Sequence, residues 1–148
     1  MLRLRPAKWL CIQTLALAAL TISCKRPAET TGFTTAAKLP FGAVDTKLIG
    51  QPLHGTVQIV GWALSEGGMR QVLLYLDRNF VTLGNLGMER PDVAKNLPGL
   101  PNSAKCGWEA LLDTSNIAPG SHRLTIQAQS KDGATYDLLD TLVTIEKP

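Results

Sequence analysis

The sequence predicts an all-β domain in the part of the chain that follows residue 40. Short apolar runs there alternate with a period of two residues rather than 3.6, which is the signature of strands. Gly, Pro, Asn and Asp separate these runs, as is typical of turns. No segment carries the long amphipathic pattern of a helix, so the core is expected to form between sheets.

Seven segments carry the strand pattern. In chain order they are 46–49, 56–61, 72–76, 80–83, 107–112, 124–129 and 136–145. The segment 72–76 is apolar on both faces, which is typical of a central strand, whereas 124–129 alternates apolar and polar residues. A turn at 77–79 is expected to join 72–76 and 80–83 as a hairpin. About seven short strands is the number expected of an immunoglobulin-like antiparallel β-sandwich.

The connection 84–105 departs from this pattern. It contains Pro91, Pro98 and Pro101, which disfavour regular strand pairing. A proline followed by an acidic residue favours one helical turn at 91–96, because both suit the first turn of a helix. Long irregular connections in compact domains are usually functional or mobile, so the sequence predicts one long irregular loop of interest here.

The N-terminus is predicted to be a targeting segment. Arg3, Arg5 and Lys8 form a basic head, and 9–22 is uncharged and almost wholly apolar. This is the pattern of a secretory signal peptide, and the run is shorter than the roughly 20 apolar residues that a membrane-spanning helix needs. The same three cations account for the whole formal charge of +3. The rest of the chain is therefore near neutral, which argues against a nucleic-acid partner.

The end of the apolar run resembles the lipobox of bacterial lipoproteins, in which a small residue precedes a cysteine that receives lipid. The run ends in Leu20-Thr21-Ile22-Ser23-Cys24. The resemblance implies a signal peptide at 1–23, cleavage between Ser23 and Cys24, and acyl chains such as palmitate on Cys24. Lys25 after that cysteine implies the outer membrane of a bacterial envelope, with the protein facing the periplasm or the exterior. An ordinary cleaved signal peptide and an uncleaved signal anchor stay open as alternatives.

After the signal, the chain is expected to consist of a linker at 24–40 and one domain at 41–148. The linker is small, polar and proline-containing, and such a composition cannot bury enough apolar area to fold. Two of the three cysteines, Cys11 and Cys24, lie in the signal or at its end. Cys106 alone remains, so no disulfide can form within the domain.

The domain also resembles an immunoglobulin-like module that occurs singly or in repeats in secreted and cell-surface bacterial proteins. The residues that carry the resemblance are Gly61-Trp62-Ala63, Arg90-Pro91-Asp92-Val93-Ala94, Gly107-Trp108 and Pro119-Gly120-Ser121-His122. It extends over about 50–145, and Cys106 departs from the small residue expected at its position. Such modules are accessory, so the resemblance implies a non-catalytic binding or spacer role toward an envelope protein or a glycan, with no cofactor.

Four side chains are candidates for binding. Arg90 and Asp92 either bond the long loop to the sandwich or contact a ligand, with the planar donors of Arg90 suited to a carboxylate or to sugar hydroxyls. Trp62 and Trp108 each follow a glycine beside a predicted strand. A buried tryptophan in the sandwich core is the commoner explanation for each, and stacking on a sugar ring is the alternative.

Catalysis and metal binding have weaker support. Cys106 with His54 or His122 is the one combination from which a small envelope enzyme or metal-binding protein would be built, and it is the alternative function. The three residues lack metal-ligand spacing. We therefore predict no enzyme, no metal and no catalytic residue.

Overall fold

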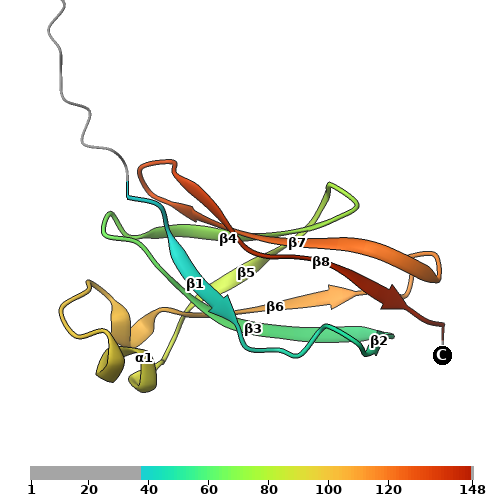
Figure 1. Ribbon diagram of the computed structural model, residues 1–148, viewed down its shortest axis with the longest axis horizontal. Helices are drawn as coiled ribbons and strands as arrows, with labels where there is room; N and C mark the ends of the chain where they lie inside the picture. The colour runs from blue at the N-terminus through green and yellow to red at the C-terminus, as the bar shows by residue number, and fades with distance from the viewer. Residues whose placement is uncertain (1–37, 148) are drawn as a thin grey trace, which may run out of the picture. The chain divides into compact units, whose positions relative to one another are not determined.

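The computed structural model describes residues 38–147 (Figure 1). The predicted signal peptide, Cys24 and nearly all of the predicted linker lie outside the described residues. The elements are β1 (Phe41–Val44), β2 (Pro52–Leu53), β3 (Thr56–Leu64), β4 (Met69–Leu76), β5 (Asn79–Met88), α1 (Pro91–Asn96), the 3-10 turn η1 (Ser103–Lys105), β6 (Gly107–Asp113), β7 (Gly120–Ser130) and β8 (Thr135–Ile145). No helix in this part of the chain is long and apolar enough to cross a membrane.

The strands form a two-layer sandwich in the order β1-β3-β6-β5-β4-β7-β8-β2. The strand β5 belongs to both layers: its first half pairs with β4, and its second half pairs with β6. One layer is therefore β1, β3, β6 and the end of β5, and the other is β4, β7, β8 and the start of β5. This is the strand arrangement of an immunoglobulin-like fold, so the predicted fold class is confirmed.

The two N-terminal strands, β1 and β2, close one side of this sandwich because they pair with opposite layers. β1 pairs antiparallel with β3, whereas β2 pairs parallel with β8 in the opposite layer. β1 also lies against β8. The two layers are thus joined at this side by the N-terminal strands and at the other side by β5, which crosses between them (Figure 1).

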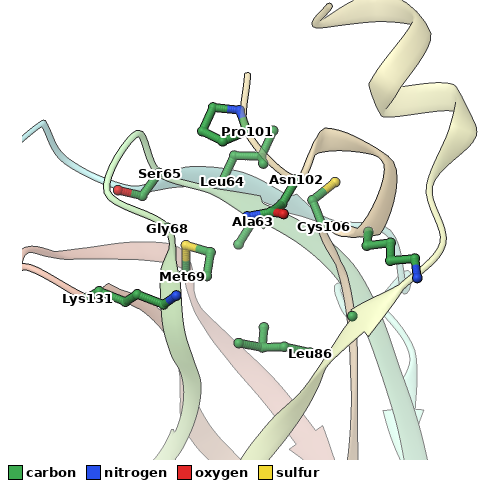
Figure 2. Close-up of a pocket in the computed structure, with 12 residues that line it drawn as sticks. Ala63, Leu64, Ser65, Gly68, Met69, Leu86, Pro101, Asn102, Cys106 and Lys131 are labelled. Atoms are coloured by element: carbon green, nitrogen blue, oxygen red, sulfur yellow. The ribbon is translucent and has the colours of Figure 1, made fainter. Parts of the chain in front are cut away.

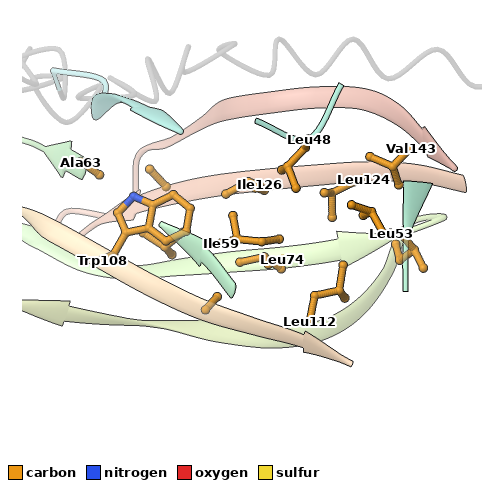
Figure 3. Packing of buried hydrophobic residues seen from close by; sticks show 14 of the residues in the cluster. Leu48, Leu53, Ile59, Ala63, Leu74, Trp108, Leu112, Leu124, Ile126 and Val143 are labelled. Atoms are coloured by element: carbon orange, nitrogen blue, oxygen red, sulfur yellow. The ribbon is translucent and has the colours of Figure 1, made fainter. Parts of the chain in front are cut away.

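The core lies between the two layers and is built from the inward positions of alternating strands (Figure 3). Ile59, Leu74, Leu112, Leu124 and Ile126 are fully buried. Each lies two positions along its strand from another inward residue, which is the period that the sequence displays. The predicted alternation in 56–61, 72–76, 107–112 and 124–129 is confirmed.

Trp108 is the largest core side chain, and two glycines make room for its indole ring. Its side chain is 1 % exposed and lies on β6 between Gly61 of β3 and Gly84 of β5. A Cβ on Gly61 would lie 2.7 Å from Cζ2 of the ring, and one on Gly84 would lie 3.3 Å from Cε3. Gly61, the residue before Trp62, therefore makes room for Trp108, because the close approach of the ring leaves no space for a side chain at position 61.

The predicted leading strand at 46–49 is wrong. The first strand is β1, at Phe41–Val44, and the chain leaves β3 immediately afterwards. The amides of Asp45 and Thr46 both donate to the carbonyl of Val60, and the Val60 amide donates to Thr46 Oγ1 at 2.8 Å. These bonds end the β1–β3 ladder, and Leu48 is buried in the core from an irregular segment.

The long irregular loop is shorter than predicted, because β5 runs on to Met88 instead of ending at 83. Gly87 has a φ of 100°, and the β5–β6 register shifts between Leu86 and Met88. A glycine in this region of φ permits a bulge that keeps the strand paired. The predicted helical turn at 91–96 is confirmed as α1.

Candidate functional site

The residues with functional potential gather at two opposite ends of the sandwich. One end, which we call the helix end, carries α1, η1, the β3–β4 turn and the β7–β8 turn (Figure 1). The other, which we call the hairpin end, carries the β4–β5 turn at Asp77-Arg78 and the start of β7. The strand register fixes this division, because Trp62 pairs with Gly107 at one end and Thr56 with Asp113 at the other.

The helix end contains a pocket of about 170 Å³ (Figure 2). Its walls are mainly apolar, from the end of β3, the start of β4, the bend of β5 and the segment before β6. Lys105 and Lys131 line it as well, neither forms an ion pair with a described residue, and no described lining residue is acidic. The pocket therefore offers positive charge beside an apolar surface.

Two small polar groups also line this pocket. Ser65 is 3 % exposed, and its hydroxyl has no hydrogen-bond partner in the described part of the chain. The Cys106 thiol is buried, and that burial raises its pKa. A thiol with a raised pKa is a weak nucleophile at neutral pH, so Cys106 behaves as a small core residue.

All three guanidinium nitrogens of Arg90 bond carboxylates of its own chain. Its Nε and Nη2 atoms donate to the two oxygens of Asp92 at 2.9 and 2.7 Å, and its Nη1 donates to Asp45 Oδ2 at 2.6 Å. These bonds raise the pKa of Arg90, and the bond to Arg90 lowers the pKa of Asp92 to about 2. The guanidinium thereby ties α1 to the segment that follows β1.

Trp62 also contacts both β1 and the cluster around α1. Its ring meets that of Phe41 edge to face, with centroids 5.9 Å apart, and the side chain packs against a small cluster that includes Val93 of α1 and Cys106. Trp62 is partly buried and Trp108 is in the core. Stacking on a sugar needs an exposed ring face, and the buried Trp108 offers none.

The structure does not bring Cys106 together with either histidine. Cys106 lies at the helix end, next to the first residue of β6, whereas His122 lies near the start of β7 at the hairpin end. Asp113 lies seven positions after Cys106 along β6, a distance of roughly 23 Å at about 3.3 Å per residue. His54 precedes β3 at the far end of that strand as well. The structure thus contradicts a site built from Cys106 with His54 or His122.

His122 has a structural partner at each ring nitrogen. Nδ1 lies 2.6 Å from Asp77 Oδ2, and Nε2 lies 2.8 Å from the carbonyl oxygen of Ala118. The bond to Asp77 is the largest cause of the raised pKa of His122, and the Arg123 amide and His122 together lower the pKa of Asp77. The imidazole thus joins the β4–β5 turn to the loop before β7. Among the described residues, no three His, Cys, Asp or Glu side chains group as metal ligands.

Sequence reasoning missed three contributors to these ends of the molecule. Asp45 lies 45 residues from Arg90, and nothing in its local sequence marks it as a partner. Lys105 and Lys131 come from separate loops that only the folded sandwich brings to one pocket. The sequence shows that all three residues are charged, but it does not show that Asp45 bonds Arg90 or that the two lysines line one pocket.

Comparisons with known proteins assign the chain to no family. No protein-family model and no curated protein matches the sequence. Among solved structures, the chain is similar to fibronectin(III)-like modules of Clostridium thermocellum CbhA, with 13% sequence identity and a TM-score of 0.48. The similarity covers 74% of this chain and 48% of that one, so this chain spans about half the length of that neighbour. The strand order by itself identifies the immunoglobulin-like fold.

Proposed function

We propose that the protein is a non-catalytic, lipid-anchored module of the bacterial envelope that binds or spaces other envelope components. The observation that carries the proposal is that the polar candidate side chains at both ends of the immunoglobulin-like sandwich bond to the chain itself. Arg90 and His122 are both engaged by the chain's own carboxylates and carbonyls. Their bonds rigidify the two ends of the sandwich, as expected of a scaffold rather than of a reaction centre.

The lipobox resemblance supports the anchor. An acyl chain contributes about 0.8 kcal/mol per buried CH₂, and more than one chain is needed for stable anchoring. Cells given a fatty-acid analogue should label the wild type and lose the label with Cys24→Ala. Cys11→Ala and Cys106→Ala are matched controls that should keep it, because they remove the other two cysteines of the chain.

Two results of that experiment would contradict the anchor. Labelling that persists in Cys24→Ala places the lipid elsewhere or makes it nonspecific. A mature mass that lacks 1–23 but carries no lipid identifies an ordinary secretory signal. Fractionation of labelled cells then tests the outer-membrane location that Lys25 implies.

For the ligand, we propose an envelope protein that contacts the helix end. The support is the apolar pocket there with its two lysines, Lys105 and Lys131, which suits an apolar side chain beside a carboxylate. A photo-crosslinking residue at Asn102, on the pocket rim, should capture a partner in living cells. The same residue at Gln127, on the polar outer face of β7, is the control and should capture none.

A glycan is the competing ligand, and Trp62 is the side chain on which it depends. Purified envelope glycan that binds the wild type, but not Trp62→Leu, would favour that ligand. Loss of the Asn102 adduct in Lys131→Glu, with unchanged thermal stability, would favour the protein.

A further inference from the structure

One strand of the sandwich has an edge that a single bulge protects. The first half of β5, Asn79 to Gly84, pairs with β4 on one side, and on its other side it has no strand partner among residues 38–147. β6 joins β5 only from Asn85 onward. A row of backbone donors and acceptors along 79–84 is therefore left free to pair with another strand.

The side chains of this edge are unusual as well. From Asn79 to Met88 the sequence is NFVTLGNLGM, which contains no charged residue and no proline. Soluble proteins usually protect an edge strand with Lys, Pro or a bulge, because an exposed apolar edge is a template for association. A register shift opposite Val81 is the one such device here.

The exposed residues of the edge continue onto the neighbouring strand. Phe80 is 54 % exposed and Leu83 is 48 % exposed. In the register they pair with Tyr75 and Leu73, which are the outward positions of β4, and the rings of Tyr75 and Phe80 meet edge to face at 6.1 Å. The outer face of β4 and β5 is thus an apolar strip, and no packed element covers it in the described structure.

The far half of the same layer has the opposite character. On the outer face of β7 and β8, Arg123 binds both oxygens of Asp140, and Gln127 donates to Asp137. Leu142 is exposed there, but as a single apolar residue near that ion pair. Within this layer, the extended apolar surface therefore lies on the β5 edge and its neighbour β4.

We propose that the β5 edge is a self-association site, at which two copies of this chain pair antiparallel through 79–84 about a twofold axis. In a twofold contact each residue faces a residue of the same strand, so any charge near the axis would oppose its own kind. The strand has none. With Val81 opposite Thr82 of the second copy, Phe80 lies opposite Leu83 on the same outer face.

The small size of this contact predicts a weak affinity between the two copies. Six residues on each side form a small interface, below the roughly 1,200 Å² at which specific complexes become stable, so the expected dissociation constant is about micromolar to millimolar. Such a contact acts when the local concentration is high. Two copies held on one membrane by the proposed anchor would meet that condition.

The test is sedimentation of the purified full chain from about 10 μM to 1 mM, together with exchange of those backbone amides in 79–84 that point away from β4. We expect a dimer that grows with concentration and protects these amides in step. Leu83→Lys should raise the dissociation constant at least tenfold, by placing a charge beside the axis. Leu142→Lys is the matched control, since it adds the same charge to an exposed leucine of the same layer and should leave the dimer intact.

Four outcomes would overturn the proposal. They are a monomer at every concentration, a dimer that Leu83→Lys leaves unchanged, a dimer that Cys24→Ala abolishes, and a concentration-independent protection of the amides that point away from β4. The third assigns association to the lipid, and the fourth means that residues before Lys38 cover the edge. Thermal unfolding of both lysine variants verifies the fold, and the lipid-labelling experiment is scored separately, so failure of the anchor does not decide this test.

Discussion

Gly61→Ala should be among the most destabilising single substitutions in the domain. The new Cβ would lie 2.4 Å from the carbonyl oxygen of Ala43 and 2.7 Å from Cζ2 of Trp108. The first of these atoms belongs to the backbone of β1, which pairs with β3 at this point, and the second to a buried ring. Neither can move without disturbing a ladder or the core, so the cost should reach the upper end of overpacking, about 3 kcal/mol.

Gly84→Ala is the matched control because it adds the same methyl group against another part of the same indole. There the Cβ would lie 3.2 Å from Val72 Cβ and 3.3 Å from Trp108 Cε3, so the neighbours need to shift by only a few tenths of an ångström. The expected loss is below about 1 kcal/mol. On a domain of this size, 3 kcal/mol corresponds to a fall in Tm of about 12–24 °C.

Urea unfolding followed by far-UV circular dichroism measures both variants, with the m-value showing whether the same surface is exposed on unfolding. Equal losses for Gly61→Ala and Gly84→Ala, or a loss below about 1 kcal/mol for Gly61→Ala, would refute the tighter packing of Gly61 against the Ala43 carbonyl and the Trp108 ring. Adding Trp108→Phe to Gly61→Ala should not restore stability, because the contact with the Ala43 carbonyl remains.

Three further predictions concern the two ends of the sandwich. Arg90→Lys should lower Tm by a few degrees, because a lysine lacks the planar fork that bonds both oxygens of Asp92 while a third nitrogen bonds Asp45, and 1 M NaCl should narrow the difference in Tm from wild type. The bond to Asp77 raises the pKa of His122, so the stability that this pair supplies is complete below about pH 6.5 and is lost as the pH rises through the raised value. In urea unfolding, the stability advantage of wild type over His122→Gln should therefore shrink as the pH rises above about 6.5, and a difference that stays constant with pH would exclude the linkage. Arg78→Gly should stabilise the domain by about 0.5–1 kcal/mol in the same assay, because Arg78 has a φ of 68° in a two-residue hairpin turn where glycine is unstrained.

The strands could be predicted wherever alternation and burial coincide. Ile59, Leu74 and Ile126 are spaced by two residues from other core side chains, and the sequence displays that period directly. The segment 46–49 failed for the converse reason. Leu48 buries its side chain without strand pairing, since the ladder has already ended at Asp45 and Thr46. The apolar residues there indicate burial, but they do not determine the backbone conformation.

The extent of β5 could not be predicted because two glycines hid it. Gly84 and Gly87 look like strand breakers, yet one leaves space for the Trp108 ring and the other forms a bulge. Both roles depend on strands that are distant in sequence. The pairing of Arg90 shows the same limit. Asp92 is two residues away, so the sequence suggests it as a partner, whereas Asp45 is 45 residues away and only the fold brings it to Arg90.

The β5 edge and the helix-end pocket should respond differently to salt, because they would recognise partners by different forces. The edge offers backbone groups and apolar side chains from a strand without charge, whereas the pocket carries Lys105 and Lys131. Raising NaCl from 50 to 500 mM shortens the screening length from about 14 to about 4 Å. Self-association should then change less than about twofold, while capture of an anionic partner at the pocket should weaken several-fold. A dimer that dissociates in high salt would mean that the lysines, and not β5, hold it together.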